Sequence, residues 1–197
     1  LRVFKDTARS FTDLPNQCIE GYTIQVAGDN NKKEDNFYVT YQGSGGTGNW
    51  KETVAPNLQN KFRAATLPHT LKQKLDANGN LYFCFTTGSD YEGSGWSDRL
   101  AGDDFTNPFP SFTNNTISDI FFHRSRLGLV SGENVIFSET NNFFNFFRTT
   151  VRTLLDTDPI DVAVSQNEVS ELKAAVPIQD SLLLFSELNQ FTLSATQ

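Results

Sequence analysis

The chain has 197 residues, of which 38% are hydrophobic and 20% are charged, and its formal net charge is −7. A single domain of this size buries roughly 70% of its unfolded surface, and the 18 Phe, 5 Tyr and 2 Trp argue against disorder. No apolar run reaches the ~18 residues of a membrane-spanning helix, and no signal peptide is visible, so the sequence predicts neither. The acidic balance argues against a protein that grips nucleic acid through its phosphates.

Two further features of the composition concern the chain's origin. Met is absent, even from position 1, so we expect an internal piece of a longer product, which a comparison of its mass with the complete coding product would test. Cys18 and Cys84 show no metal-ligand spacing. We expect Cys84 to act as a small buried hydrophobe, and two cysteines without an export signal fit a reducing compartment.

The pattern before residue 110 is mainly β. Period-two alternation predicts strands over Gly21–Val26 and Asn36–Tyr41. The glycine-rich stretch Gly43–Gly48 lacks the Lys-Ser/Thr of a phosphate-binding loop, so a hairpin tip is the better interpretation. Asn78-Gly79 separates the strand-like runs Thr70–Leu75 and Asn80–Phe85 and predicts a second hairpin.

The chain changes character near Pro110, after the extended, proline-stiffened segment Thr106–Pro110. We therefore predict a β-rich, platform-like module over residues 1–110 and a second unit over residues 111–197. The strands predicted in the second unit are Ile117–His123, Leu127–Ser131, Asn134–Ser138, Phe143–Phe147, Ile160–Ser165, Val169–Ala175, Leu182–Ser186 and Gln190–Ser194. One short helix is expected over Arg148–Asp156, ended by Pro159.

An internal repeat links the two halves of this second unit. Ile117–Ile120 matches Val169–Leu172 at an offset of 52 residues, and Leu127, Leu129, Ser131 and Asn134 match positions 55 residues later. Ser138 and Thr140 match at an offset of 56, so the alignment needs two small insertions. A period of ~40–55 residues suits the blades of a β-propeller, which needs ~4–8 blades, so we predict about two blades of an incomplete ring. The predicted fold class is all-β: an antiparallel β module followed by propeller-like blades.

No cofactor or metal site is predicted, and no catalytic residue. His69 and His123 lack the spacing of zinc ligands, and Gly43-Ser-Gly45 and Gly93-Ser-Gly95 are too short for a nucleophile elbow. Asp103 and Asp104 are adjacent, so a pair of catalytic carboxylates of the glycosidase type remains an alternative.

The other acidic residues that could join such a pair are Glu92, Asp98, Glu133 and Glu139. Solvation of surface loops is the better interpretation for all of these carboxylates. Asp156–Asp161 lacks the glycine and final Glu of a calcium loop and is predicted to be a solvated turn.

Four Phe within Phe143–Phe147 must be buried, either in the core, which is the default, or in an oligomer interface. Single Ser replacements at Phe146 and Phe147, read out by assembly state, would separate the two.

Several sequence motifs occur in a characteristic order along the chain. They are Asp13–Pro15, Trp50–Pro56, Leu67–Leu71, Ala101–Asp104, Thr106–Pro108, Pro110–Phe112, Phe121–Gly128, Ser131–Asn134, Phe143–Phe147 and Asp158–Ser165. In this order the chain resembles the tail nozzle (tail tubular protein B) family of short-tailed bacteriophages, from about Asp13 to its last residue. Ser125 stands where Asn is expected in many relatives.

The resemblance implies a structural protein of the virion, assembled in the host cytoplasm, and not an enzyme. It implies a homo-oligomeric ring, typically a hexamer, below the portal and adaptor (tail tubular protein A) and alongside tail fibres. DNA would pass through the lumen without specific binding, and the 23 acidic against 16 basic residues suggest walls that repel phosphates. The alternative is a carbohydrate-binding or carbohydrate-cleaving β module acting on the host envelope.

Overall fold

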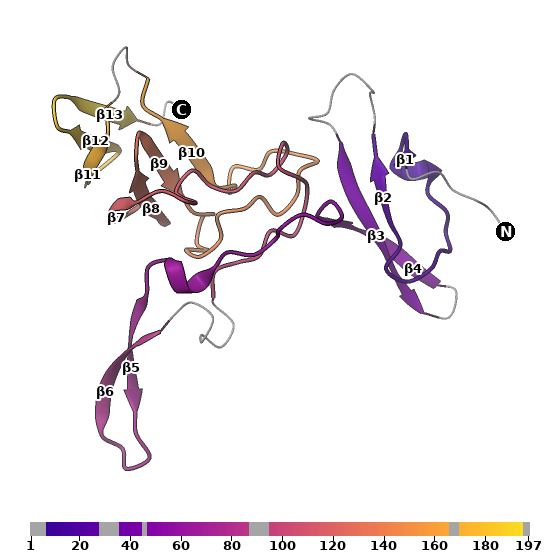
Figure 1. Cartoon of the computed structure of the whole chain (residues 1–197), viewed down its shortest axis with the longest axis horizontal. Helices are drawn as coiled ribbons and strands as arrows, with labels where there is room; N and C mark the ends of the chain where they lie inside the picture. The colour runs from indigo at the N-terminus through magenta and orange to yellow at the C-terminus, as the bar shows by residue number, and fades with distance from the viewer. Residues whose placement is uncertain (1–6, 28–35, 45–46, 87–94, 166–169, 195–197) are drawn as a thin grey trace.

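A computed structural model of the chain describes residues 7–27, 36–44, 47–86, 95–165 and 170–194. Within these ranges the protein is mainly β, as predicted, with four separate sheets and two short 3-10 helices. The N-terminal sheet and the two C-terminal sheets lie at opposite ends of the molecule, and a hairpin projects from the irregular segments between them (Figure 1).

The N-terminal sheet has four strands in the order β1-β2-β3-β4. They are β1 (Thr7–Ala8), β2 (Thr23–Val26), β3 (Phe37–Ser44) and β4 (Thr47–Thr53). The 3-10 helix Phe11–Asp13 follows β1 and is capped by Ser10. Strands β3 and β4 pair as far as Ser44 and Thr47, which confirms the predicted hairpin, although residues 45 and 46 lie outside the described residues. The core of this sheet contains Leu14, Ile24, Val26 and Val39.

The second predicted hairpin is also confirmed, as β5 (Thr70–Leu75) and β6 (Leu81–Thr86), preceded by the 3-10 helix Ala64–Thr66. Its turn is stabilised by Asp76, whose carboxylate accepts hydrogen bonds from the backbone N–H groups of Asn78 and Asn80 and from the Asn80 amide. These bonds, the Asn80 side chain first, lower the pKa of Asp76.

Two stacked sheets form the C-terminal region. The first runs in the order β10-β9-β8-β7 and the second in the order β11-β12-β13. Their strands are β7 (Ile117–His123), β8 (Arg126–Ser131), β9 (Asn134–Phe137), β10 (Ile160–Ala163), β11 (Leu172–Ile178), β12 (Ser181–Ser186) and β13 (Gln190–Ser194). These confirm seven of the eight predicted strands, with shifted ends; the predicted start of β11 at Val169 lies outside the described residues.

The predicted strand Phe143–Phe147 is wrong, because this segment consists of turns and irregular backbone. Phe146 and Phe147 are neighbours in the sequence and both are buried, at 4% and 1% exposed, whereas a strand points successive side chains to opposite faces. The Asn145 side chain accepts a hydrogen bond from the Phe147 N–H, and this local bond replaces a strand ladder.

The helix predicted over Arg148–Asp156 is also wrong, because the segment forms bends and turns. Its β-branched run of Thr149, Thr150, Val151 and Thr153 disfavours a helix. The Asp158 carboxylate accepts the Leu155 N–H, and the Arg148 side chain donates to the Thr153 carbonyl. Side chains therefore hold this backbone in an irregular path.

The structure simplifies the predicted repeat to one constant offset. Strands β11 and β12 begin and end 55 positions after β7 and β8. Each hairpin has a β-bulge at the same place, between Ile117 and Asp119 in one and between Leu172 and Ala174 in the other. The predicted offset of 52 for the first strand is therefore wrong, and the three repeated strands align without an insertion.

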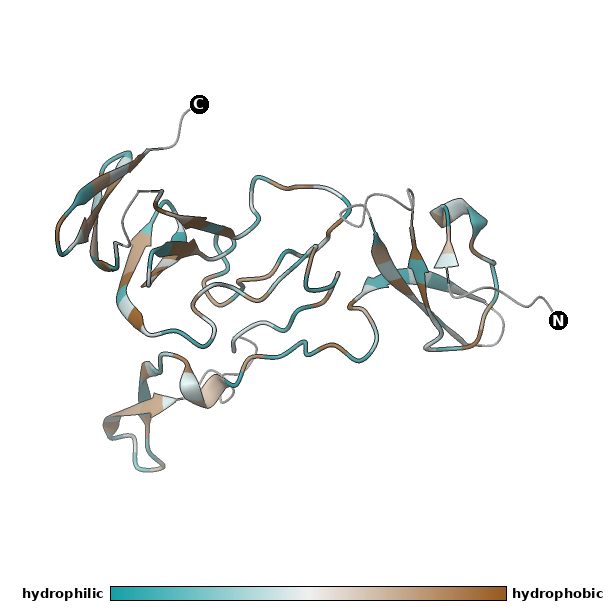
Figure 2. Ribbon diagram, turned by 45° about the horizontal axis from the view of Figure 1, so that its top comes forward, coloured by the Kyte–Doolittle hydropathy of each residue, from teal (hydrophilic) through white to brown (hydrophobic). Residues whose placement is uncertain are grey.

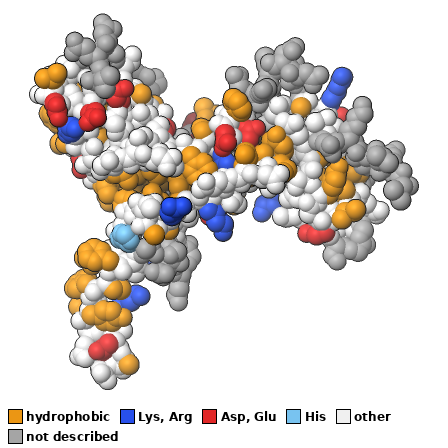
Figure 3. Space-filling view, viewed as in Figure 1, with side chains coloured by type: hydrophobic (Ala, Val, Ile, Leu, Met, Phe, Trp, Pro, Cys, Tyr) orange, Lys and Arg blue, Asp and Glu red, His pale blue; other side chains and the backbone are white. Residues whose placement is uncertain are grey.

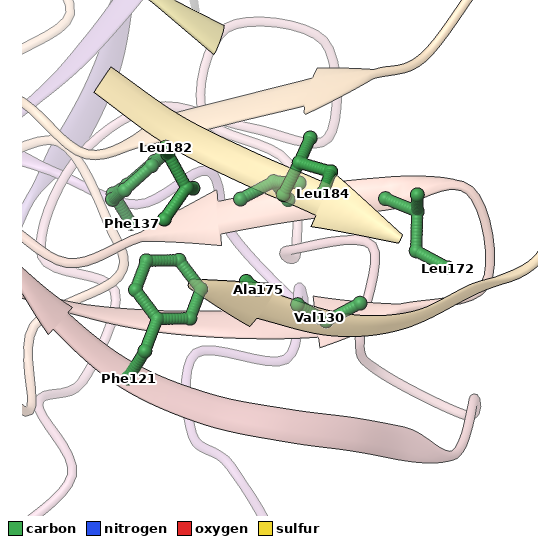
Figure 4. Packing of buried hydrophobic residues seen from close by; sticks show 8 residues of the cluster. Phe121, Val130, Phe137, Leu172, Ala175, Leu182 and Leu184 are labelled. Carbon is green, nitrogen blue, oxygen red and sulfur yellow. The ribbon is translucent and has the colours of Figure 1, made fainter. Parts of the chain in front are cut away.

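The two repeated sheets stack so that their equivalent faces point in the same direction. One buried cluster fills the space between the sheets, with Phe121, Val130 and Phe137 on the first sheet and Leu172, Ala175, Leu182 and Leu184 on the second (Figure 4). The other face of the first sheet carries Ile117, Leu127 and Leu129, which are the counterparts, 55 residues earlier, of Leu172, Leu182 and Leu184. That face packs against Phe112, Phe146 and Trp96. Figure 2 shows the apolar residues gathered along these strands.

Gly128 explains how the Phe121 ring enters this stack. The two residues are paired across β8 and β7, and a Cβ at position 128 would lie 2.2 Å from the ring. The missing side chain leaves room for Phe121 to pack edge-on against Phe137, with ring centroids 5.6 Å apart.

Candidate functional site

The two adjacent carboxylates that could have formed a glycosidase pair both shape a loop. Asp103 Oδ1 accepts hydrogen bonds from the N–H groups of Phe105 and Thr106 and from the Thr106 hydroxyl. Asp104 pairs with Arg99 at 2.6 Å. Both groups are thus used in local structure, which gives no support to an acid and base facing each other across a sugar.

The other candidate carboxylates are dispersed over separate local contacts. Asp98 pairs with Lys61 at 3.2 Å, and Glu133 accepts the Ser170 N–H. Glu139 accepts from the amides of Asn142 and Asn145. Glu92 lies outside the described residues. The structure therefore does not bring the candidate carboxylates that it describes together.

Arg99 is a buried arginine with several hydrogen-bond partners, and the sequence pattern did not single it out. It is 1% exposed, lies over the Phe109 ring, and donates to the carbonyls of Gln59 and Asn107 as well as to Asp104. A buried guanidinium requires such partners. Arg99 therefore joins the irregular segment around Gln59 to its own segment, which contains Asp104, Asn107 and Phe109.

A second buried arginine organises the turns after β9. Arg126 Nη1 donates to the carbonyls of Ser138 and Asp158 at 2.7 Å, and Nη2 donates to Asp156. Burial lowers the pKa of Arg126, while the nearby carboxylates of Asp158 and Glu139 oppose that shift. A guanidinium nonetheless stays protonated in proteins.

The predicted turn over Asp156–Asp161 is confirmed at its start, where Asp156 and Thr157 are exposed, but Asp158, beside this cluster, is buried instead of solvated. It is 3% exposed and accepts from Arg148 Nε at 3.2 Å. Asp161, at the other end of the segment, accepts from the Ser111 N–H and the Asn134 amide. Asp161 therefore connects this segment to β9 through Asn134, and Asp158 connects it to Arg148.

The remaining candidate side chains do not assemble into a site. Among the described residues, no three His, Cys, Asp or Glu side chains lie close enough together to hold a metal ion. Cys18 and Cys84 are free and half-buried, so Cys84 is less buried than expected. In the part of the chain that is described, no helix is long and apolar enough to cross a bilayer.

A cleft of about 440 Å³ lies at the base of the projecting hairpin. Aromatic rings of Phe62, Phe109 and Phe112 line it together with amides of Gln59 and Asn115. Phe62 also stacks on the buried Phe147, with centroids 4.8 Å apart, so these rings belong to the aromatic core. The lining contains no acidic side chain and thus supplies no carboxylate pair.

The β5–β6 hairpin carries a group of exposed apolar side chains on one face. Cross-strand pairing places Leu71 with Phe85 and Leu75 with Leu81, so these side chains and Phe83 share one face. All five are 54% to 75% exposed. Figure 3 shows hydrophobic side chains along the projecting arm. A surface of this kind marks a contact with another molecule or another segment.

Comparison with known proteins identifies the family. The family model described as "Bacteriophage nozzle protein" matches residues 1–197. The chain belongs to the bacteriophage nozzle protein family. It is 40% identical over 189 residues to the "Tail tubular protein gp12" of Escherichia phage T7. That alignment covers 96% of this chain and 22% of the T7 protein, so the chain spans about a fifth of its relative.

Membership of the nozzle family supports a structural role in a phage tail and places the described surfaces in that context. The Phe143–Phe147 segment is mostly core, since Phe146 and Phe147 are buried. Phe143 is 39% exposed and packs edge-on against Phe122, so the segment reaches the surface at its first residue.

Proposed function

We propose that the chain is part of a structural, non-enzymatic component of a phage tail tube, which assembles into a ring whose lumen conducts the genome during ejection. The observation that carries this proposal is the match of the nozzle family over residues 1–197, together with the 40% identity to the T7 tail tubular protein. The ring is a homo-oligomer, six subunits in this proposal. It contacts an adaptor above and fibres beside it, in a virion assembled in the host cytoplasm.

The stacking of the two repeats supports a propeller as the finer architecture. The forward face of the first sheet is covered by the rear face of the second. The forward face of the second sheet, which carries Val176 and Ile178 at 45% and 47% exposed, is open among the described residues. Because equivalent faces point the same way, a further repeat would add the same contact, as successive propeller blades do. The division at residue 110 into a platform-like module and a propeller portion belongs to this proposal, although Trp96 and Phe146 pack together across it.

The charge balance supports a conducting role for the lumen. The chain carries 23 acidic and 16 basic residues, and negative walls repel phosphates, which lets DNA slide instead of binding. Filter binding to duplex DNA at low salt should give only ordinary non-specific affinity. Tighter binding would contradict a repelling wall.

Electron microscopy of the complete gene product tests the main proposal. A ring with a central pore is expected, and monomers or pore-free aggregates at all concentrations would overturn it. Envelope polysaccharide should remain uncleaved, and turnover lost in Asp103→Asn or Asp104→Asn would instead favour the carbohydrate-cleaving alternative.

A further inference from the structure

The cleft at the base of the β5–β6 hairpin has the size and the wall of a small-molecule site. Its volume of about 440 Å³ falls within the range of ~300–1,000 Å³ that such sites occupy. Residues of the segments 59–67 and 109–117 line it, so two distant parts of the chain form one concave surface. The lining contains one cation, Arg63, and no acidic side chain. The wall therefore favours an anionic ligand.

Three polar groups of the wall are not used inside the protein. Arg63 is exposed and forms no ion pair with an acid in the described part of the chain, whereas the nearby Lys61 pairs with Asp98 at 3.2 Å. The exposed Asn114 amide has no hydrogen-bond partner within the described ranges. The Thr113 hydroxyl is buried without one. A buried hydroxyl without a partner is costly, and a hydrogen bond from a molecule in the cleft would offset that cost.

The aromatic rings of the wall have their faces occupied by other side chains. Phe62 stacks on Phe147 and on Phe112, with ring centroids 4.8 and 5.7 Å apart. The Arg99 guanidinium covers one face of Phe109 at 4.9 Å. A nucleobase binds by stacking on an open ring face, and these rings offer little of it. Hydrogen bonds and charge must therefore provide most of the recognition in this cleft.

We propose that this cleft binds an acidic saccharide, a sugar unit that carries a carboxylate or a phosphate. The Arg63 guanidinium pairs with the acidic group, because its planar fork of donors matches both kinds of anion. The Asn114 amide and the Thr113 hydroxyl each donate and accept, as neighbouring sugar hydroxyls require. The site binds without cleaving, since its lining holds no carboxylate pair.

Ligand-observed saturation-transfer NMR on the complete gene product tests the ligand class. We expect glucuronate and glucose 6-phosphate to bind with dissociation constants of about 1 mM, and neutral glucose to bind at least about fivefold more weakly. Inorganic phosphate should compete with glucose 6-phosphate at least about fivefold less well than glucuronate does. Equal competition by phosphate would reduce the site to one for simple anions, and tighter binding of adenosine monophosphate would make it a nucleotide site. Either result, equal binding of glucose, or no binding of the acidic sugars at about 10 mM would overturn the proposal.

Matched variants place the binding in this cleft. Arg63→Gln should weaken binding of glucuronate about tenfold, whereas Arg9→Gln, at an exposed position of the N-terminal region, makes the same change of net charge and should alter it less than about twofold. Asn114 and Asn141 are both exposed and lie at φ +68° and +62°, so glycine keeps either backbone while removing the amide. Asn114→Gly should weaken binding about threefold or more, and Asn141→Gly should leave it unchanged. Equal effects of site and control variants would overturn the proposal.

The melting temperature shows whether a variant acts through the site or through the fold. Arg63 and Asn114 are exposed, so we expect each variant to melt with its control. If Asn114→Gly melts lower than Asn141→Gly, the comparison of Arg63→Gln with Arg9→Gln decides. Saccharide binding and ring assembly are separate readouts of the same product. A ring that binds no acidic sugar would overturn this site and leave the proposed tail function intact, and a product that binds the sugar without forming a ring would do the reverse.

Discussion

The first C-terminal sheet and the β5–β6 hairpin use the same residue types with opposite results. Leu129 in β8 is 0% exposed, whereas Leu75 in β5 is 66% exposed. The central strands β8 and β9 contribute side chains to one cluster on each face, but the hairpin's Leu/Phe face has no such cover among the described residues. The comparison teaches that alternation specifies a strand and its faces, while the cover on each face depends on the rest of the assembly.

Truncation of a leucine should give the largest difference in the free energy of unfolding between the first C-terminal sheet and the β5–β6 hairpin. Leu129→Ala should lower the free energy of unfolding by about 2–5 kcal/mol, because it leaves a cavity in a fully buried cluster. Leu75→Ala should change it by about 0.5 kcal/mol or less in unassembled protein. Urea denaturation measures both, and equal losses would show that the hairpin face is packed within the chain.

Glycine substitutions sharpen the same comparison. Gly128→Ala should cost about 1–3 kcal/mol, because the new Cβ meets the Phe121 ring at 2.2 Å. Gly79→Ala, in the hairpin turn, has nothing within 4 Å but a φ of +83°, so it should cost about 1 kcal/mol of backbone strain. Adding Phe121→Ala should remove most of the Gly128→Ala penalty and leave the Gly79→Ala penalty unchanged. Additivity at positions 121 and 128 would contradict the packing argument.

The turns of the two hairpins differ in how they reach positive φ. The β5–β6 turn uses Gly79, whereas the β7–β8 turn has Arg124 and Ser125 at +48° and +59°. Asn tolerates this region better than Ser, so Ser125→Asn should raise the free energy of unfolding by about 0.5 kcal/mol. Chemical denaturation would detect the gain, and a loss would show that the serine is preferred there.

The smallest expected effect is a pH dependence in the sheet. Burial, followed by Arg124, lowers the pKa of His123 below its ordinary value of 6.5, while Asp180 opposes the shift. The unfolded state then binds the proton more readily, so stability decreases as the pH falls through 6.5 towards the lower folded-state pKa. His123→Gln should flatten the unfolding free energy between about pH 7 and pH 5. An unchanged slope would place the dependence on other groups.

Much of the fold follows from the sequence where local signals agree. The period-two run Ile117–His123 and the Asn78-Gly79 turn predict β7 and the β5–β6 hairpin correctly. Phe143–Phe147 failed because composition indicates burial but not backbone path, which here depends on hydrogen bonds of the Asn145 side chain. The offset of 52 failed because similar residues near the bulge, of which only the serine is identical, favoured a shifted alignment that strand pairing excludes.

The candidate surfaces were only half predictable. The sequence predicts the hairpin, but nothing local to Leu71 or Phe85 says that the chain leaves them uncovered. Arg99 and Arg126 were missed, because arginine is ordinarily a surface residue. Their burial arises from carbonyl groups contributed by segments up to 40 and 32 positions away.

Arg126 also has a consequence for the order in which the chain folds. Its guanidinium lies on β8, whereas two of the carbonyls it serves belong to Asp156 and Asp158, 30 and 32 positions later. Until that long loop closes, the cation keeps its water and can leave it only when several acceptors arrive together. The β8–β9 hairpin can form before that closure, because its connection is short and costs little loop-closure entropy. We therefore expect closure of the segment from Ser138 to Asp158 to be a late step of folding, completed by the hydrogen bonds of Arg126.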